Sequence, residues 1–144
     1  MTSIRSLLDA KSSQPVIWSV KPSQTVRDAL ELMKKHDIGC VLVMEDKHLQ
    51  GILSERDYAR KMILVGKASA DTPVSDIMTR KVVCASRDNN VNECLALMNQ
   101  HDFRHLPVVE DDHIYGMVSI GDLIGSIIKE QQETIEHLQH YIAG

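Results

Sequence analysis

The sequence is poor in aromatic residues, in excess positive charge and in long apolar runs. Aromatic residues make up 3% of the 144 residues, which is few for a protein that stacks bases on aromatic platforms. Lys and Arg number 16 against 20 acidic residues, so the net charge of −4 disfavours bulk electrostatic binding to nucleic acid or anionic membranes. No apolar stretch approaches the roughly 18–20 residues of a membrane span. We therefore expect no nucleic-acid partner and no membrane, and any bound anion must be small and held locally.

Cysteines and catalytic motifs are also scarce. Cys40, Cys84 and Cys94 show no Cys-x-x-Cys spacing, which predicts reduced thiols in the cytoplasm, and no secretory signal is recognisable at the start. A nucleophile elbow, a Walker A loop and Gly-x-Gly-x-x-Gly are all missing, so we predict that the protein is not an enzyme. His101 and His105 lack the further ligands that zinc needs, so we expect no metal.

The chain contains an internal duplication. A shift of 65 residues aligns 26–57 with 91–122 without a gap, and 13 of the 32 positions are identical. In each copy a Thr or Asn cap precedes apolar residues at i, i+3, i+4 and i+7, which predicts a helix that stops at His-Asp. Two short apolar runs separated by a polar turn follow, Cys40–Met44 with Leu49–Leu53 and Leu106–Val109 with Ile114–Val118. These predict two β-hairpins.

Shorter segments complete each copy. We predict leading strands at 16–18 and 81–84, and helices at 58–65 and 123–129. The linker holds an apolar helical turn at 74–78, and residues 4–8, with similar spacing, are predicted to play the same part for the first copy. We therefore divide the chain into an N-terminal segment or helix (1–14), a first repeat (15–66), a linker with a short helix (67–79), a second repeat (80–130) and a C-terminal helical tail (131–144).

A duplicated β-α-β-β-α unit resembles the CBS domain pair, the family named for cystathionine β-synthase. The resemblance rests on GILSERD (51–57), GMVSIGD (116–122), RHLPVVED (104–111) and the linker DTPVSDIMT (71–79). It implies an α/β (α+β) fold in which tandem repeats pack as a pseudo-twofold pair and leave two clefts. In the family these clefts bind adenosine-containing ligands such as AMP, ADP, ATP, NAD or S-adenosylmethionine without a metal. It also implies a homodimer, for which an apolar stripe of Ile127, Ile128, Ile135 and Leu138 is the expected contact.

The resemblance also implies the nucleotide-binding residues. Asp57 and Asp122 would hold ribose hydroxyls, with Ser54 and Ser119 near ribose or phosphate. A carboxylate suits a cis-diol, and a helix N-terminus suits an anion. The Asp122 cleft is expected to use Val16, Ile17, Trp18, Ile38, Gly39, Cys40, Arg104 and Gly121, and the Asp57 cleft to use Lys81, Val82, Val83, Phe103, Arg104, His105 and Arg56. Arg56, Arg104, Lys81 and Arg60 would favour additional phosphates on the Asp57 side.

Other interpretations remain open. Asp57 and Asp122 can be helix N-terminal charges, and the arginines can be solvated surface residues. The leading hypothesis is a regulatory module that senses an adenine nucleotide and signals to an unknown partner protein. A structural dimerisation or scaffold module with degenerate clefts is the alternative, and an enzyme acting on a nucleotide is a third.

Overall fold

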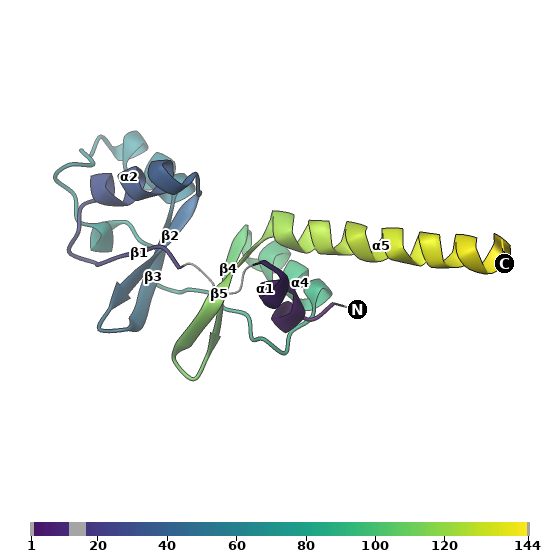
Figure 1. The fold of residues 1–144 in the computed structure, drawn as a ribbon. Helices are drawn as coiled ribbons and strands as arrows, with labels where there is room; N and C mark the ends of the chain where they lie inside the picture. The colour runs from purple at the N-terminus through teal and green to yellow at the C-terminus, as the bar shows by residue number, and fades with distance from the viewer. Residues whose placement is uncertain (1, 12–16, 144) are drawn as a thin grey trace. The chain divides into compact units, whose positions relative to one another are not determined.

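The computed structural model describes residues 2–11 and 17–143 (Figure 1). The chain divides into two compact units. The first-repeat unit consists of residues 17–82, and the second-repeat unit combines residues 1–16 with residues 83–144. Each unit has its own apolar core.

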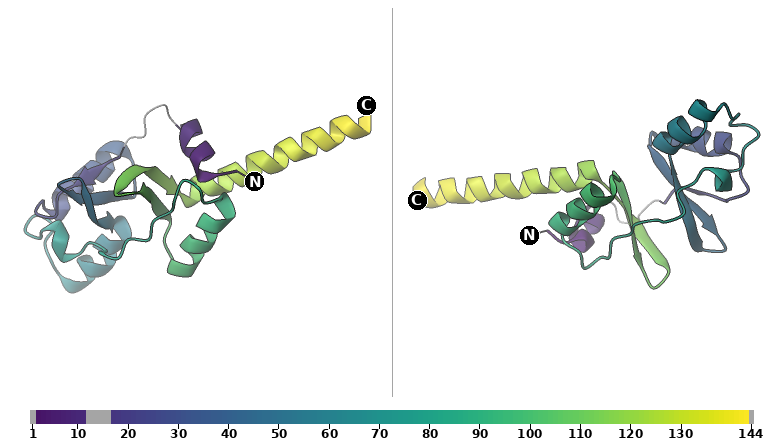
Figure 2. Two further views of the ribbon diagram at one scale, coloured as in Figure 1. Left: turned by 90° about the horizontal axis from the view of Figure 1, so that it is seen from below. Right: turned by 180° about the vertical axis from the view of Figure 1, so that it is seen from behind.

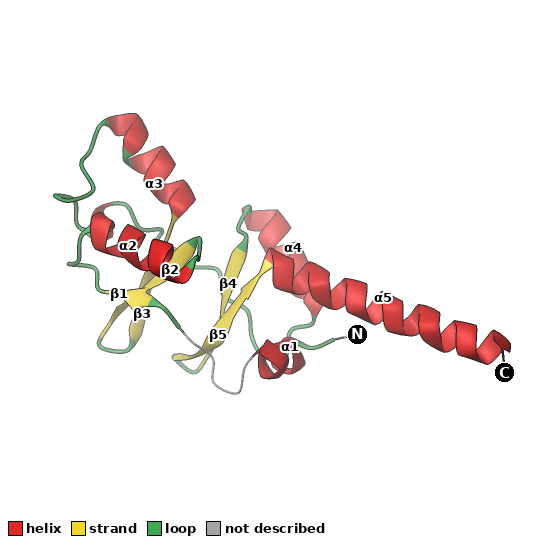
Figure 3. Cartoon of the chain, turned by 45° about the horizontal axis from the view of Figure 1, so that its top comes forward, coloured by secondary structure: helices red, strands yellow, loops and turns green. Residues whose placement is uncertain are grey.

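Each unit contains a helix, two strands and a further helix in this order, and the element that precedes them differs (Figure 3). The first-repeat unit contains β1 (Ser19–Val20), α2 (Val26–His36), β2 (Cys40–Glu45), β3 (His48–Ser54), α3 (Glu55–Lys61) and two 3-10 turns, η1 (Ile63–Val65) and η2 (Val74–Asp76). The second-repeat unit contains α1 (Ile4–Lys11), α4 (Val91–His101), β4 (His105–Glu110), β5 (His113–Ser119) and α5 (Ile120–Ala143). The expected α+β fold class is confirmed.

The two central helices begin and end as their sequences predict. Thr25 caps α2 by accepting a bond from the backbone N–H of Asp28, and the Asp28 carboxylate accepts one from the N–H of Thr25. Asn90 and Glu93 form the same reciprocal pair at α4. Both helices end at an Asp in the left-handed region. This conformation stops a helix and is tolerated by Asp because its short side chain bonds locally.

The hairpins are also confirmed, with bounds one or two residues longer than predicted. β2 pairs with β3 and β4 with β5 in antiparallel register, and each pair carries a bulge at the same place, Val43/Met44 and Val108/Val109. Both turns have two residues with positive φ, which suits a right-handed twisted hairpin.

The leading strands differ from the prediction. In the first copy the strand is Ser19–Val20, in parallel pairing with β2, and Val16 lies outside the described residues. In the second copy residues 81–84 form no strand, and a single parallel bridge joins Ala85 to Val108. The first copy adds a bond from the Leu42 N–H to the Trp18 carbonyl. Pro107 occupies the position of Leu42 in the second copy and has no N–H, so this bond cannot form there.

The prediction that residues 4–8 serve the first copy is wrong. Ile4, Leu7 and Leu8 pack in the core of the second-repeat unit, with Val91, Cys94 and Met98 of α4. Val74, Ile77 and Met78 of the linker pack in the core of the first-repeat unit. In this unit α1 lies beside β5 (Figures 1 and 2). Each repeat is therefore completed by the apolar segment that precedes the other repeat in the chain.

The last helices of the two repeats have different lengths. α3 ends at Lys61 and gives way to a 3-10 turn closed by Gly66 in the left-handed region, so the predicted helix 58–65 is only half α-helical. The matching position in the second copy is Gln131, which allows α5 to continue for 24 residues. Within the described ranges, no helix is long and apolar enough to span a membrane.

Candidate functional site

The Ser-x-x-Asp corner of the first repeat joins β3 to α3. Ser54 is the N-cap of α3, and its hydroxyl accepts a bond of 3.1 Å from the Asp57 N–H. The Asp57 carboxylate returns the contact, since its Oδ2 accepts bonds from the Ser54 N–H at 3.0 Å and the Ser54 hydroxyl at 3.1 Å. The capping interpretation of Asp57 is therefore confirmed as one of its roles.

The second oxygen of Asp57 is also engaged. Its Oδ1 accepts a hydrogen bond from the Thr79 hydroxyl at 3.1 Å and lies 3.0 Å from the Lys61 ammonium. The Asp57 side chain is only 13% exposed. The carboxylate thus contacts four polar groups of its own unit, from Ser54, Lys61 and Thr79, and a ribose diol would compete with them.

The matching corner of the second repeat joins β5 to α5. The Asp122 Oδ2 accepts a bond of 2.8 Å from the Ser119 N–H, and the Ser119 hydroxyl accepts one of 3.1 Å from the Asp122 N–H. This reproduces the reciprocal cap of the first repeat. Asp122 is half-buried at the start of the 24-residue helix α5.

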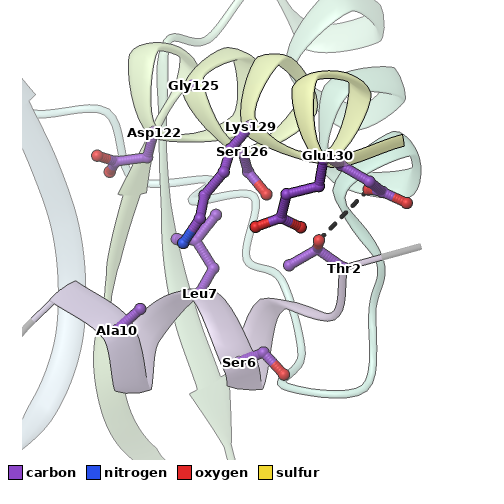
Figure 4. A pocket seen from close by; sticks show the side chains of 10 residues that line it. Thr2, Ser6, Leu7, Ala10, Asp122, Gly125, Ser126, Lys129 and Glu130 are labelled. Carbon is purple, nitrogen blue, oxygen red and sulfur yellow. Dashed lines mark hydrogen bonds between the residues drawn. The ribbon is translucent and has the colours of Figure 1, made fainter. Parts of the chain in front are cut away.

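Asp122 also lies on the wall of an open groove between α1 and α5 (Figure 4). The groove has a volume of about 370 Å³ and is lined mainly by small and polar side chains, among them Ser6, Ser126 and Lys129. One end is closed where the Thr2 hydroxyl donates to Glu130 at 3.4 Å. The side chain of Lys129 reaches across the groove toward α1.

The loop before each hairpin lies against the corner of the same repeat. The Glu55 N–H donates to the Gly39 carbonyl at 3.0 Å, and the Ile120 N–H donates to the Arg104 carbonyl at 2.9 Å. In the strand register Cys40 faces Ser54, and His105 faces Ser119. The structure therefore brings Gly39 and Cys40 to the Asp57 corner, and Arg104 and His105 to the Asp122 corner.

The surroundings of the first corner change the pKa of the Cys40 thiol. Burial, and then the negative charges of Asp57 and Glu55, raise the pKa of Cys40 to about 12. The raised pKa keeps the Cys40 thiol protonated at neutral pH, so Cys40 forms a small wall of the corner. Among the residues with described positions, no three His, Cys, Asp or Glu side chains are grouped so as to hold a metal ion.

The other predicted site residues lie at the surface or are half-buried. Trp18 stacks on His36 of α2 with ring centroids 3.4 Å apart, and the ring centroids of Phe103 and His101 are 6.2 Å apart. The exposed residues are Arg56, Lys81, Arg104 and Gly121, and the half-buried residues are Ile17, Trp18, Ile38, Gly39, Val82, Val83, Phe103 and His105. The sharing of residues between the two repeats stays a prediction.

Two residues at the first corner, Lys61 and Thr79, are not among those predicted from the sequence. Lys61 lies four residues after Asp57, a spacing that brings opposite charges together on a helix and could have indicated the ion pair. Thr79 comes from the far end of the linker and is placed by backbone pairing with Ile52. No local pattern indicates that contact.

Comparison with known proteins identifies the repeated unit. The family model of the CBS domain matches residues 8–64 and 74–129. The chain belongs to the CBS domain family. This CBS pair is 39% identical over 125 residues to CBS domain-containing protein CBSX3, mitochondrial, of Arabidopsis thaliana, and the match covers 83% of the chain and 61% of that protein. A CBS-domain protein from Burkholderia ambifaria is 41% identical, with a TM-score of 0.86 over 90% of this chain and 96% of that one.

CBS pairs are generally regulatory modules, and some bind adenosine-containing ligands. The CBS pair of protein MJ0100 was solved in complex with 5′-methylthioadenosine and S-adenosyl-L-methionine. It shares the fold of this CBS pair, with a TM-score of 0.75 over 91% of the chain at 22% identity.

Proposed function

We propose that this CBS pair is a regulatory module that binds an adenosine-containing ligand and signals its presence to a partner protein. The observation that carries the proposal is the repeated Ser-x-x-Asp corner, in which a carboxylate sits beside a helix N-terminus in both repeats. A carboxylate accepts hydrogen bonds from a ribose diol, and the helix N-terminus attracts a phosphate. The complex of the MJ0100 pair supports an adenosine ligand for this fold.

The two corners are proposed to differ in affinity. Asp122 lies on the wall of an open groove of about 370 Å³, which offers a ligand space beside this corner. At the other corner a ribose would have to replace the bonds of Asp57 to Thr79 and Lys61, and a ligand gains only the surplus over the contacts that it replaces. On the space that the groove offers, we assign the tighter site to Asp122 and the weaker one to Asp57.

Calorimetric titration with AMP, ADP, ATP and NAD tests the assignment. A hydrogen bond to a charged group contributes about 1.5–3 kcal/mol, so Asp122→Asn should weaken the tighter site by about ten- to a hundredfold. Asp57→Asn should leave that site unchanged and affect only a weaker second one. The near-isosteric substitution keeps an acceptor at each cap, and thermal unfolding of both variants checks that the fold persists. If both variants bind all four ligands as tightly as the parent, the ribose assignment is wrong.

Charge around the first corner would select among nucleotides. Arg56 and Arg60 are exposed on α3, and Lys81 follows the linker. These side chains are proposed to favour additional phosphates on the Asp57 side. Arg56→Ala should then weaken binding of ATP more than binding of AMP, because the ribose contact is untouched. An equal loss for the two nucleotides would contradict this role.

A scaffold module is the second candidate, and one observation favours it. The carboxylate of Asp57 forms its hydrogen bonds and its ion pair within its own unit. Such internal bonding is expected where a cleft no longer binds a ligand. Thermal shift with the four nucleotides separates the candidates, since a module without functional clefts should show no shift at millimolar concentration. Turnover of ATP or NAD, abolished in Asp122→Asn, would revive the enzyme hypothesis.

The module is proposed to act in the cytoplasm as a homodimer. A ligand can shift a conformational equilibrium only if it binds two states unequally, so the partner must recognise one of them. Affinity capture with the intact protein, with and without AMP, tests this requirement. Identical sets of captured proteins under the two conditions would contradict signalling. Light scattering tests the dimer, which should have twice the 16.2 kDa mass of the chain.

A further inference from the structure

The loop before the central helix is built alike in the two repeats. The Lys21 N–H donates to the side-chain carbonyl of Gln24 at 2.8 Å, and the Ser86 N–H donates to that of Asn89, also at 2.8 Å. The backbone just before each loop pairs in parallel with the first strand of the hairpin, at matching positions in the two repeats. Residues 65 positions apart can therefore be compared directly at this place.

In the second repeat this loop holds an arginine against the hairpin. The Glu110 carboxylate, at the end of β4, accepts hydrogen bonds from the Arg87 guanidinium at 2.9 and 3.1 Å and from the Arg87 N–H at 3.0 Å. The Ser86 hydroxyl adds a further bond of 3.0 Å. The guanidinium also lies over the Tyr115 ring, 3.7 Å from its centroid. The end of this hairpin thus binds a guanidinium that its own unit supplies.

The first repeat keeps the carboxylate of this arrangement and loses its donors. Glu45 occupies the position of Glu110, whereas Pro22 stands at the position of Arg87 and Lys21 at that of Ser86. Pro has neither a guanidinium nor an N–H. Glu45 is exposed, and within the described ranges no group forms a hydrogen bond or ion pair with its carboxylate. The acceptor is therefore available to a donor from outside the chain.

A hollow of about 360 Å³ lies beside Glu45, within the first-repeat unit. Its polar lining comes from the loop, through Lys21 and Gln24, and from the end of the hairpin, through Glu45 and Asp46. Two carboxylates face one ammonium there, so the hollow has a net negative charge. Its volume falls within the roughly 300–1,000 Å³ of small-molecule sites, which is ample for one side chain.

We propose that the hollow beside Glu45 binds the guanidinium of an arginine side chain from a partner protein, in the place that Arg87 takes in the second repeat. A guanidinium donates several N–H groups in a plane, which suits a carboxylate better than the point charge of a lysine ammonium. The hollow lies at the turn end of the hairpin, whereas Ser54 lies at its other end. The arginine contact is therefore separate from the corner at which a nucleotide is proposed to bind.

Amide chemical shifts of the isotope-labelled full chain test the site, with N-acetyl-argininamide as the probe and N-acetyl-lysinamide as its control. At millimolar concentration the arginine compound should shift the amides around Gln24 and Glu45. Glu45→Gln removes the charge and should weaken binding about tenfold, while Glu31→Gln, at an exposed acid of the same unit, should leave it unchanged. Equal shifts from the two compounds, or none from either, overturn the proposal. Free L-arginine that binds about tenfold tighter than the capped compound would assign the hollow to the amino acid and overturn the protein partner.

Exchange of the matching residues between the repeats provides an independent test. Pro22→Arg should fill the hollow from its own chain and abolish binding of the probe there. Pro22→Ala is the matched control and should keep the binding, because it restores an N–H that Glu110 accepts together with the guanidinium in the second repeat. Arg87→Ala should open the same place in the second repeat, so that the probe shifts the amides around Glu110 and Tyr115.

Thermal unfolding of each variant checks that the fold persists. Undiminished binding of the probe beside Glu45 in Pro22→Arg overturns the proposal, and so does the absence of new shifts around Glu110 in Arg87→Ala. AMP titration of the parent is a separate readout, and its failure would affect the proposed function alone.

Discussion

Removal of the Asp57 carboxylate should cost more folding free energy than the loss of a helix cap alone. The Asp57 carboxylate caps α3, and loss of a cap interaction costs about 1 kcal/mol. Asp57 additionally accepts a hydrogen bond from Thr79 at 3.1 Å and pairs with Lys61 at 3.0 Å.

These additional contacts set the size of the difference. A hydrogen bond to a charged acceptor contributes about 1.5–3 kcal/mol when buried, and Thr79 is only half-buried, so we take the lower end. The Lys61 side chain is 45% exposed, which limits its ion pair to about 0.5 kcal/mol. We therefore expect Asp57→Ala to cost about 3 kcal/mol, of which the cap accounts for about 1 kcal/mol.

Urea unfolding followed by fluorescence and circular dichroism measures the loss for Asp57→Ala. Trp18 is the only tryptophan and lies in the first-repeat unit, so its emission reports on the unit that contains Asp57. A double-mutant cycle with Thr79→Val should give a coupling of about 1 kcal/mol between Asp57 and Thr79. A loss of only about 1 kcal/mol for Asp57→Ala, together with no coupling to Thr79, would refute this account of the first corner.

Three further predictions follow from local geometry. Gly51→Ala should destabilise the protein by about 1–3 kcal/mol in urea unfolding, because a Cβ at this position would lie 2.7 Å from the Thr79 carbonyl oxygen. Gly125→Ala should instead stabilise the protein by about 0.5–1 kcal/mol, because a Cβ there would have no atom within 4 Å and Ala favours the helix. Iodoacetamide should modify one thiol per native chain, the exposed Cys84, since the other two are buried; mass spectrometry that finds rapid modification elsewhere would contradict this. The hydrogen bond from Arg87 lowers the pKa of Glu110, so Glu110→Gln should lose stability relative to the parent above pH about 4.5, and the difference should shrink as the pH falls below that value.

The duplication explains why so much of each repeat could be predicted. The caps, the helix ends and the hairpin turns depend on residues within a few positions of each other, and the same types recur 65 residues later. The strand bulges fall at matching places because the register is set by the same apolar alternation. The absence of a strand at residues 81–84 also has a local cause, because Pro107 stands at the position of Leu42 and has no N–H to donate.

The site was predictable only as far as its contacts are local. The reciprocal caps of Ser54 with Asp57 and of Ser119 with Asp122 follow from spacing alone. The engagement of Asp57 by Thr79 depends on a backbone bridge between β3 and the linker, formed by residues distant in sequence. Such a contact bears directly on how available the Asp57 carboxylate is to a ligand.

The placement of α1 shows the same limit at the level of the core. Apolar spacing indicates which face of residues 4–8 is buried. It does not indicate which of the two similar cores this face packs in. Backbone hydrogen bonds fix the placement of each segment. The Ile4 N–H donates to the Asn89 carbonyl at 2.9 Å, and the Val74 N–H donates to the Gln24 carbonyl at 2.7 Å. Each linker segment thus docks at the start of the central helix of one unit.

This exchange makes a prediction that distinguishes the two cores. Ile4 and Val74 are both fully buried, and truncation of Ile4 to Ala should cost about 2–5 kcal/mol. Ile4→Ala should accelerate amide exchange in α4, β4 and β5 and leave α2, β2 and β3 unaffected, although Ile4 precedes the first repeat. Val74→Ala should do the reverse, with a smaller effect because fewer atoms are removed. If Ile4→Ala instead loosens residues 17–82, the segment serves the repeat that follows it and the exchange of segments does not occur.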